Sequence, residues 1–543
     1  MSWFRRRSGP VGPQGVAVRL RPHNRPSEVR SGRVLPHPIW WGLLLASVFY
    51  LGAHYSVVTG VWPIHGTSPG AGNTLIRDMA AFGGWLGVLL ALRLLGYRGN
   101  WAIVALPVII FFLTRPAQFQ VFTDPVYQAV RGTRAEMNDL KATRSRLSTL
   151  ERAYDGERRQ LVFGTAEPVL PDPMAQAVSA ATTGQGATTR LLSLWTVLIA
   201  PLALLIGFLL ARRGELLRWF REHKRIPFLP ALAVFFVLTM FFTRLGKVGG
   251  FTPWELLLPL FIATWAATLA DDAYNLARAG EVVAPRRLAG LFVYGALPVV
   301  PFLVIRELGL SIVLAGSMAM MLLVGTRRGW WAGLMMGVWA VLVAIAFNVD
   351  DRSSTRLQLA YNPYRPLTGV EVEDNRWAAK LHQMKLFDAN VLEGGIFGEG
   401  PGRGHGETAP NAADDGYITL LAAQWGFAGT VGLVLLYTLF VVQMLGVAMR
   451  ERGAFERTLV TGLAMLIGIP FWLATLGGIR IIPLTGVATA FAAHGGAKLL
   501  ASALAVGVVA GISHRRAVED RLASALAPPP SEAVPEHSGV RIR

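Results

Sequence analysis

Residues Gly394 to Gly429 read GGIFGEGPGRGHGETAPNAADDGYITLLAAQWGFAG, a glycine-rich stretch that leads into a long apolar segment. Two acids, Asp414 and Asp415, stand where the apolar segment begins. An acid at the rim of a membrane segment is costly unless it faces water or a polar cavity, so it marks a candidate site. The alternative is a solvated helix start with one acid as its N-cap. The stretch predicts a polar loop joined to a membrane helix.

Apolar blocks of this kind recur along the chain. Of its 543 residues, 52% are hydrophobic, and they form runs of about fifteen to thirty rather than amphipathic periods. The short alternating segments of a closed barrel do not occur. We therefore expect an all-α polytopic membrane protein with about twelve transmembrane helices. The segments lie near 38–57, 79–97, 101–114, 191–212, 228–243, 251–270, 287–305, 308–325, 330–348, 417–447, 458–478 and 484–513.

The positive charge reflects membrane topology rather than nucleic-acid binding. The formal net charge is +18, but the basic residues sit in short clusters between apolar blocks. Residues 1–37 form a basic segment with eight arginines against one acid, Glu28, and carry no cleavable signal pattern, so this segment is expected in the cytoplasm. Twelve crossings return the C-terminus to the same side and leave Asp415 outside. The absence of cysteine excludes disulfides and thiolate metal sites.

Two predicted external loops, 115–190 and 349–416, are long enough to carry function. In the first, Thr133 to Glu136 form a capping box, followed by apolar residues at seven-residue spacing. This pattern predicts a helix with one apolar seam, which lies on the protein or membrane surface or binds a partner. The segment 514–543 is expected to be a cytoplasmic tail without fixed structure.

The order of motifs resembles the SEDS family of peptidoglycan polymerases, which includes RodA and FtsW. The GG, GxG, proline, acid and GFAG order of residues 394–429 is similar to the family's loop before a late core helix, and the family's essential aspartate falls on Asp415. Residues 482–496, IPLTGVATAFAAHGG, look like a second family motif that contains Thr485. FTPWELLLP and RELGLS are weaker echoes that place Glu255 and Glu307 on family acids.

The resemblance implies a domain organisation. It indicates a ten-helix SEDS-like core over 101–513, preceded by two added transmembrane helices within 38–100. The family's tryptophan-bearing loop before Glu255 is missing, and only Arg244 and Lys247 precede Gly249 and Gly250 there. This loss leaves room for a function without catalysis.

The implied chemistry is polymerisation of a lipid-linked disaccharide (lipid II) outside the membrane. A sugar hydroxyl attacks an anomeric carbon while a lipid pyrophosphate departs, and Asp415 is expected to take the proton, a role worth roughly 10²–10⁴-fold in rate. Asp414 beside it is expected to bind substrate. Two adjacent acids either resist being ionised at the same time, or they bind a divalent cation, Mg or Mn, together.

Basic residues are expected to neutralise the pyrophosphate. Arg403 in the glycine loop and Lys247 are our first candidates, because arginine offers a bidentate fork and lysine a compact charge. The alternative for each is a side chain that snorkels to lipid head groups. Further candidates are Arg244, Lys380, Lys385, Arg306 and Lys498. The loop glycines either present N–H groups to an anion or form a flexible linker.

Three further residues complete the expected substrate site, namely Glu255, Glu307 and Thr485. Glu255 either lines the site or forms a structural ion pair with Arg306 or Lys247, and Glu307 either lines the cavity or holds Arg306.

The functional hypothesis is a peptidoglycan glycosyltransferase that acts in cell wall synthesis for cell shape or division. It would lie in the bacterial cytoplasmic membrane with a class B penicillin-binding protein as its transpeptidase partner. The alternatives are a non-catalytic scaffold that recruits the transpeptidase and a flippase of lipid-linked precursors.

Overall fold

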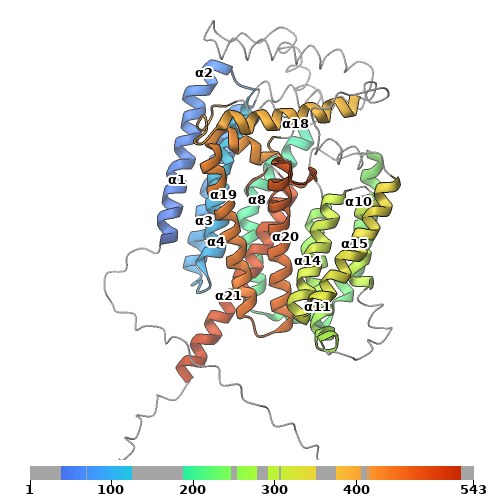
Figure 1. Ribbon diagram of the computed structural model, residues 1–543. Helices are drawn as coiled ribbons and strands as arrows, with labels where there is room; N and C mark the ends of the chain where they lie inside the picture. Colours follow the sequence, from blue (N-terminus) through green and yellow to red (C-terminus); the bar gives the residue numbers. More distant parts are fainter. Residues whose placement is uncertain are drawn as a thin grey trace, which may run out of the picture.

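The protein is a bundle of long helices that stand side by side (Figure 1). A computed structural model describes residues 38–68, 70–124, 187–245, 253–277, 292–304, 307–349, 375–404, 412–414, 416–493 and 495–526. Within these ranges the regular elements are all helices.

The longer helices are bounded as follows: α1 (Pro38–Ser56), α3 (Ala71–Leu94), α4 (Trp101–Thr123), α8 (Ala187–Arg212), α10 (Arg225–Leu245), α11 (Leu258–Ala277), α14 (Leu308–Thr326), α15 (Gly329–Val349), α18 (Asn375–Gly394), α19 (Tyr417–Arg450), α20 (Ala454–Gly478) and α21 (Gly496–Leu526). Shorter elements between them are η1 (Val57–Val61), α2 (Trp62–His65), α9 (Glu215–Glu222), η2 (Pro253–Leu257), η3 (Phe292–Ala296), η4 (Leu297–Val299) and α13 (Val300–Val304).

The predicted fold class is confirmed. Eight of the described helices are long and apolar enough to cross a membrane, and α8 with α9, bent by 77°, makes a ninth if counted as one span. Three shorter apolar helices lie at 225–238, 293–302 and 329–341. These elements fall on the twelve predicted segments, because a membrane helix must satisfy its backbone internally and present apolar side chains to lipid.

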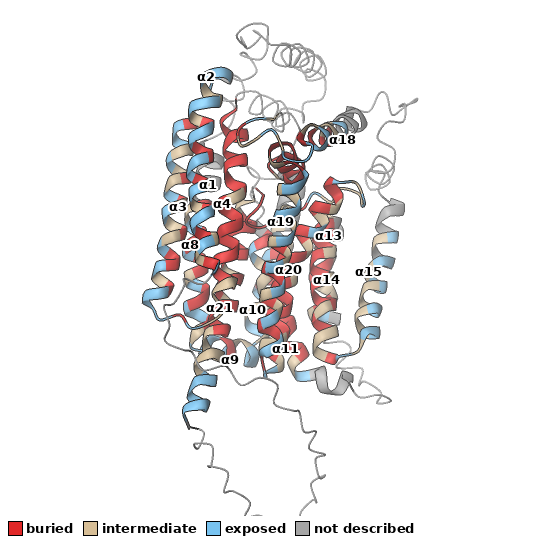
Figure 2. Cartoon of the chain, turned by 60° about the vertical axis from the view of Figure 1, so that its left-hand side comes forward, coloured by how far each residue is buried: buried red, intermediate tan, exposed pale blue. Residues whose placement is uncertain are grey.

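Burial separates a central helix from peripheral ones. Of the 18-residue apolar stretch within α4, 89% is buried inside the protein, whereas 28% of the corresponding stretch is buried in the span that contains α1. Figure 2 shows α4 almost entirely buried, whereas α1 and α15 keep exposed faces. The exposed side chains of α1 are large and apolar, for example Leu45 and Val48. We conclude that α4 lies inside the bundle and that the outer face of α1 faces lipid.

Four predicted boundaries were wrong. α21 continues to Leu526, so residues 514–526 of the predicted tail are helical. The last membrane helix begins at Gly496 rather than at 484, because Pro483, Gly486 and a left-handed Phe491 interrupt helical geometry in residues 481–493. α4 continues to Thr123, so the first long loop does not start at 115; the polar side chains of this extension bond inside the bundle. α3 begins at Ala71, eight residues before the predicted start at 79.

One end of the bundle carries the loops that matter for function. α18, which lies within the predicted external loop 349–416, runs across this end, above α19 and α20 (Figure 1). The first residue of α1 and the last of α21 lie toward the opposite end (Figure 1). We call the end with α18 the loop end. The predicted capping-box helix at 133–161 and the basic segment 1–37 lie outside the described residues.

Candidate active site

The glycine loop 394–404 caps a break in α19. Gly426, with φ 65° and ψ −169°, separates the section Tyr417–Trp425, which is buried up to Gln424, from the rest of the helix. The carbonyls that end this section accept from the loop: Glu399 N–H bonds Ala423 at 3.0 Å and Gly400 N–H bonds Gln424 at 2.8 Å. Beyond the break, the N–H groups of Phe427 and Ala428 bond the carbonyls of Gly395 and Ile396. The loop therefore completes the helix that follows the two acids.

Close backbone approach explains two of the glycines. Gly398 has φ 78° and Gly426 φ 65°, a region that other residues rarely adopt. A Cβ on Gly426 would overlap the backbone of Gly398 and Ile396, and a Cβ on Gly398 would overlap Gln424 and Gly426. Because the N–H groups of Gly398, Glu399 and Gly400 all bond carbonyls, this part of the loop neither presents N–H groups to an anion nor forms a flexible linker, so both readings were wrong for these residues.

A cluster of buried hydroxyl groups lies beside the first turn of α19. The Tyr417 hydroxyl is next to those of Thr489, in the connection before α21, and Thr475, near the end of α20. All three are buried without a hydrogen bond of good geometry within the described structure. Thr485 in the same connection also has a buried, unbonded hydroxyl. Because a buried unpaired polar group costs about 1–3 kcal/mol, such a cluster indicates a place for a polar ligand or water.

A buried acid and a buried lysine form a second polar feature. Glu255 in η2 is 6% exposed and Lys498 near the start of α21 is 2% exposed, and the two attract each other. The Lys498 ammonium also donates to the carbonyl of Leu466 at 3.4 Å. A buried charge is kept only where it is paired or hydrogen-bonded, and the pair places one anion and one cation within an apolar bundle.

Comparison with known proteins places the chain in a family. Residues 203–518 match the FtsW/RodA/SpoVE family, described as cell cycle proteins. The chain belongs to the FtsW/RodA/SpoVE family. The match covers the second part of α8 and the helices from α9 to α21, except for the last residues of α21, and leaves α1, α3 and α4 outside it.

Family relatives carry names that describe an activity. The chain is similar to "Peptidoglycan glycosyltransferase RodA" of Mycobacterium leprae, with 29% identity over 230 residues, 42% of this chain and 47% of the relative. It is also similar to "Probable peptidoglycan glycosyltransferase FtsW" of Trichlorobacter lovleyi, with 26% identity over 335 residues, 58% of this chain and 82% of the relative. The chain spans about half the length of the mycobacterial relatives that it matches.

Solved structures with some likeness include Thermus thermophilus RodA, with 18% identity, a TM-score of 0.35 and coverage of 61% of this chain and 98% of that one. A chain from the structure titled "Structural coordination of polymerization and crosslinking by a peptidoglycan synthase complex" has 18% identity, a TM-score of 0.45 and coverage of 61% and 90%.

The structure describes some of the predicted site residues of this FtsW/RodA/SpoVE family member and not others. Asp415 and Lys247 lie outside the described residues. Asp414 is half-buried just before α19, whereas Arg403 is exposed in the glycine loop. Glu307 is half-buried at the start of α14.

The structure brings two of the predicted segments together. Gly309, two residues after Glu307, packs closely against the backbone and side chain of Thr485. The start of α14 therefore lies against the connection that carries the hydroxyl cluster. Glu255 interacts electrostatically with Lys498, one of the further basic candidates, whereas its two predicted partners, Arg306 and Lys247, fall outside the described residues.

The structure adds little about the position of the remaining basic candidates. Lys385 is exposed on α18, and the side chains of Arg244 and Lys380 are not among those described. In the described part of the chain, no group of three or more His, Asp or Glu side chains is arranged to hold a metal ion. The Asp414–Asp415 pair falls partly outside that part, so a Mg or Mn ion stays a prediction.

Sequence reasoning missed several functional candidates. Asp388 on α18 forms an ion pair with Arg480, which follows α20, at 2.9 Å. Asp78 on α3 and Arg115 on α4 form another, buried one. The signal for this second pair was present, since each is a charged residue directly next to a predicted apolar segment, Asp78 before 79–97 and Arg115 after 101–114. The hydroxyl cluster carried no such signal, because threonine and tyrosine are common in membrane helices.

Proposed function

We propose that this family member is a peptidoglycan glycosyltransferase that polymerises lipid-linked disaccharide, acting in cell wall synthesis. Family membership, with relatives named for this activity, supports the proposal. The observation that carries it at the site is the cluster of buried hydroxyls beside the first turn of α19, two residues after Asp415, which lie next to one another without hydrogen bonds of good geometry. Sugars and pyrophosphate are rich in the hydrogen-bonding groups that such hydroxyls lack.

The reaction needs a base, a cation and a polar pocket next to lipid. Asp415 takes the proton of the attacking sugar hydroxyl as its oxygen bonds the anomeric carbon, and the bond from that carbon to the pyrophosphate breaks. Lys498 and Arg403 are the described cations available to the departing pyrophosphate, the first buried and the second exposed. The hydroxyls of Tyr417, Thr475 and Thr489 orient the sugars.

The cellular setting belongs to the same proposal. The chain is a multi-pass membrane protein, and we place it in the bacterial cytoplasmic membrane with the loop end outside and both termini in the cytoplasm. A class B penicillin-binding protein is the proposed transpeptidase partner, because newly made glycan chains are then cross-linked.

The test is polymerisation by the purified full chain in vesicles that contain labelled lipid II. We expect glycan chains from the parent and a loss of roughly 10²–10⁴-fold in rate for Asp415→Asn. Glu399→Gln, an exposed acid in the same loop, is the matched control and should polymerise like the parent. Asp414→Asn decides which of the two acids is the base.

Other outcomes would contradict the proposal in distinct ways. Movement of lipid II across the vesicle membrane without polymer would indicate a flippase. A chain that neither polymerises lipid II nor moves it across the membrane, but still binds the transpeptidase, would be a scaffold. Full polymerisation by Asp415→Asn would refute the assigned base.

A further inference from the structure

A buried ion pair joins the N-terminal helices to α4. Arg115 donates from Nε to Oδ2 of Asp78 at 3.0 Å and from Nη2 to Oδ1 at 2.9 Å, and both side chains are almost completely buried. His54 of α1 and Arg77 of α3 approach the same carboxylate at 3.5 Å and 3.2 Å. Charged groups within a membrane domain are expensive and are usually kept for a function. The pair therefore calls for an account beyond packing.

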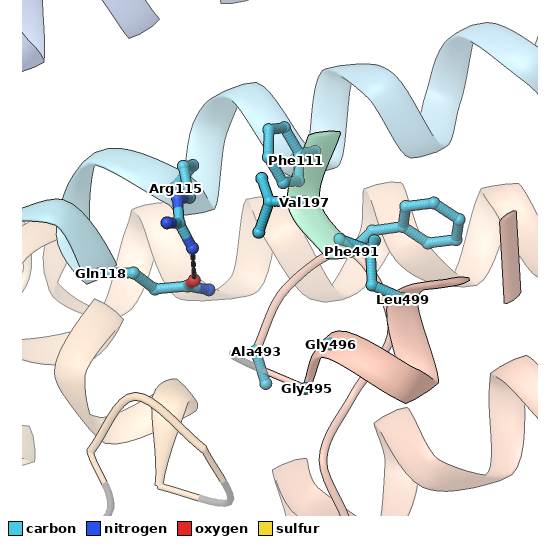
Figure 3. A pocket seen from close by; sticks show the side chains of 9 residues that line it. All are labelled: Phe111, Arg115, Gln118, Val197, Phe491, Ala493, Gly495, Gly496 and Leu499. Atoms are coloured by element: carbon cyan, nitrogen blue, oxygen red, sulfur yellow. Dashed lines mark hydrogen bonds between the residues drawn. The ribbon is translucent and has the colours of Figure 1, made fainter. Parts of the chain in front are cut away.

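The pair is connected to the second motif loop by hydrogen bonds. Nη1 of Arg115 donates to Oε1 of Gln118 at 2.9 Å, a contact drawn in Figure 3, and Nε2 of Gln118 donates to the carbonyl of Ala492 at 2.7 Å. The Thr114 hydroxyl, one residue before Arg115, donates to the carbonyl of Phe491 at 3.0 Å. Both bonds end on backbone carbonyls of a loop, not on another helix.

The loop needs such support at this point. Phe491 has φ 63°, a left-handed conformation that costs a non-glycine residue of the order of 1–3 kcal/mol. A small cavity beside it is lined by Arg115, Gln118, Phe491 and Ala493, among others (Figure 3). On the side of this cavity the loop is held by the polar bonds from α4, whereas on its other sides Phe491 packs against Trp85 and Phe440.

The N-terminal region reaches the other parts of the candidate site too. Gln120 of α4 is hydrogen-bonded to Gln424, in the buried section of α19 that precedes the break at Gly426. At the loop end of α1, the Ser56 hydroxyl donates to the carbonyl of Pro401, and Gly402 packs against Val57. α1, α3 and α4 thus contact the glycine loop, α19 and the second motif loop, although they lie outside the family match.

We propose that Arg115, Gln118 and Thr114, anchored by Asp78, are positioning residues for the transfer reaction. They hold residues 481–493 so that Thr489 keeps its place beside the start of α19 and Thr485 its place against the start of α14. The proposal rests on the proposed function, because it assigns these residues a part in that reaction. The simpler alternative is that the network only stabilises the packing of α1 and α3.

The test uses Gln118→Leu, which cuts the bond to Ala492 and leaves the Asp78–Arg115 pair in place. Gln443→Leu is the matched control, because Gln443 also ties two helices, through Asn100 at 2.8 Å, but stands far along α19 from the loop. The chain has no cysteine, so Ala493→Cys, 8% exposed in the parent, introduces one reporter thiol without background. Its rate of alkylation by N-ethylmaleimide measures how firmly the loop is held.

In the protein that carries Ala493→Cys, we expect Gln118→Leu to speed alkylation on the order of tenfold. In the chain without cysteine, we expect Gln118→Leu to slow lipid II polymerisation about 10- to 100-fold, because a small misplacement of reacting groups is costly. The thermal midpoint should match that of Gln443→Leu, for which alkylation and polymerisation stay at parental rates. A merely structural role would lower the midpoint without this local effect.

Two results would overturn the positioning role: an alkylation rate that does not change, or a faster alkylation with polymerisation kept at the parental rate. A parent chain that makes no polymer would refute the proposed function instead. In that case alkylation alone decides whether the network holds the loop, and an unchanged rate still overturns it.

Discussion

At the scale of single residues, the hydroxyl cluster combines instability with binding capacity. Tyr417, Thr475 and Thr489 come from three separate segments and bury their oxygens without good hydrogen bonds. Sites that bind polar ligands often keep groups unpaired in the absence of the ligand, at a cost to stability. A substitution that removes one of these hydroxyls should therefore raise the stability of the protein and slow glycosyl transfer.

Thr475→Val tests this opposition. Valine has nearly the same shape and lacks the unpaired hydroxyl, so we expect stability to rise by about 1–3 kcal/mol, measured as a higher thermal midpoint, while polymerisation slows. Thr268→Val is the control, because the Thr268 hydroxyl already donates to the Thr264 carbonyl at 2.9 Å. A lower midpoint for Thr475→Val would show that its hydroxyl is satisfied in the folded protein.

At the scale of elements, the connection between α19 and α20 buries an acid. Burial raises the pKa of Glu451 to about 7, against the opposing effect of Arg515 and Arg516, which lower it. The folded-state pKa thus lies above the unfolded value of 4.5. A raised pKa favours the folded protein while the acid is neutral, so this contribution is complete below about pH 4.5 and is lost as the pH rises through 7.

Glu451→Gln should remove this dependence on pH. We expect the variant to gain stability over the parent by about 1–3 kcal/mol between pH 5 and pH 8, measured by thermal or denaturant unfolding at several pH values. Glu519→Gln, whose carboxylate at the same end is largely exposed, should show no comparable slope. A constant difference between Glu451→Gln and the parent would mean that Glu451 ionises normally.

At the scale of the whole molecule, the Asp78–Arg115 pair holds α3 to α4, which in turn contacts α19 of the family match. The pair is fully enclosed between α3 and α4, and α3 also packs on α8, the first helix of the family match. A buried pair adds little compared with apolar residues of similar volume, but breaking one partner leaves an uncompensated charge.

Single and double substitutions should therefore differ. Asp78→Leu or Arg115→Met alone is expected to cost about 3–5 kcal/mol, whereas the double variant should be close to the parent in stability. Thermal unfolding of the purified proteins measures this difference. If the costs of the two single substitutions simply add in the double variant, the charges do not stabilise each other.

Local patterns were enough to predict the membrane architecture. Hydropathy placed twelve apolar segments, because the cost of exposing backbone and charge to lipid acts on each segment separately. Motif order located the glycine loop, yet its role as a cap on a broken α19 was visible only once Glu399 and Gly400 were seen to bond Ala423 and Gln424.

Amino-acid order by itself determined the class of fold, the membrane segments and the family motifs, since each depends on residues close together in the chain. Tertiary structure alone decided which buried polar groups meet. Arg115 finds Asp78 across 37 positions, Gln424 finds Gln120 across 304, and Gln118 finds Ala492 across 374. No local pattern records such partners, because a buried polar group is stabilised by whichever segment the packing of the bundle brings to it.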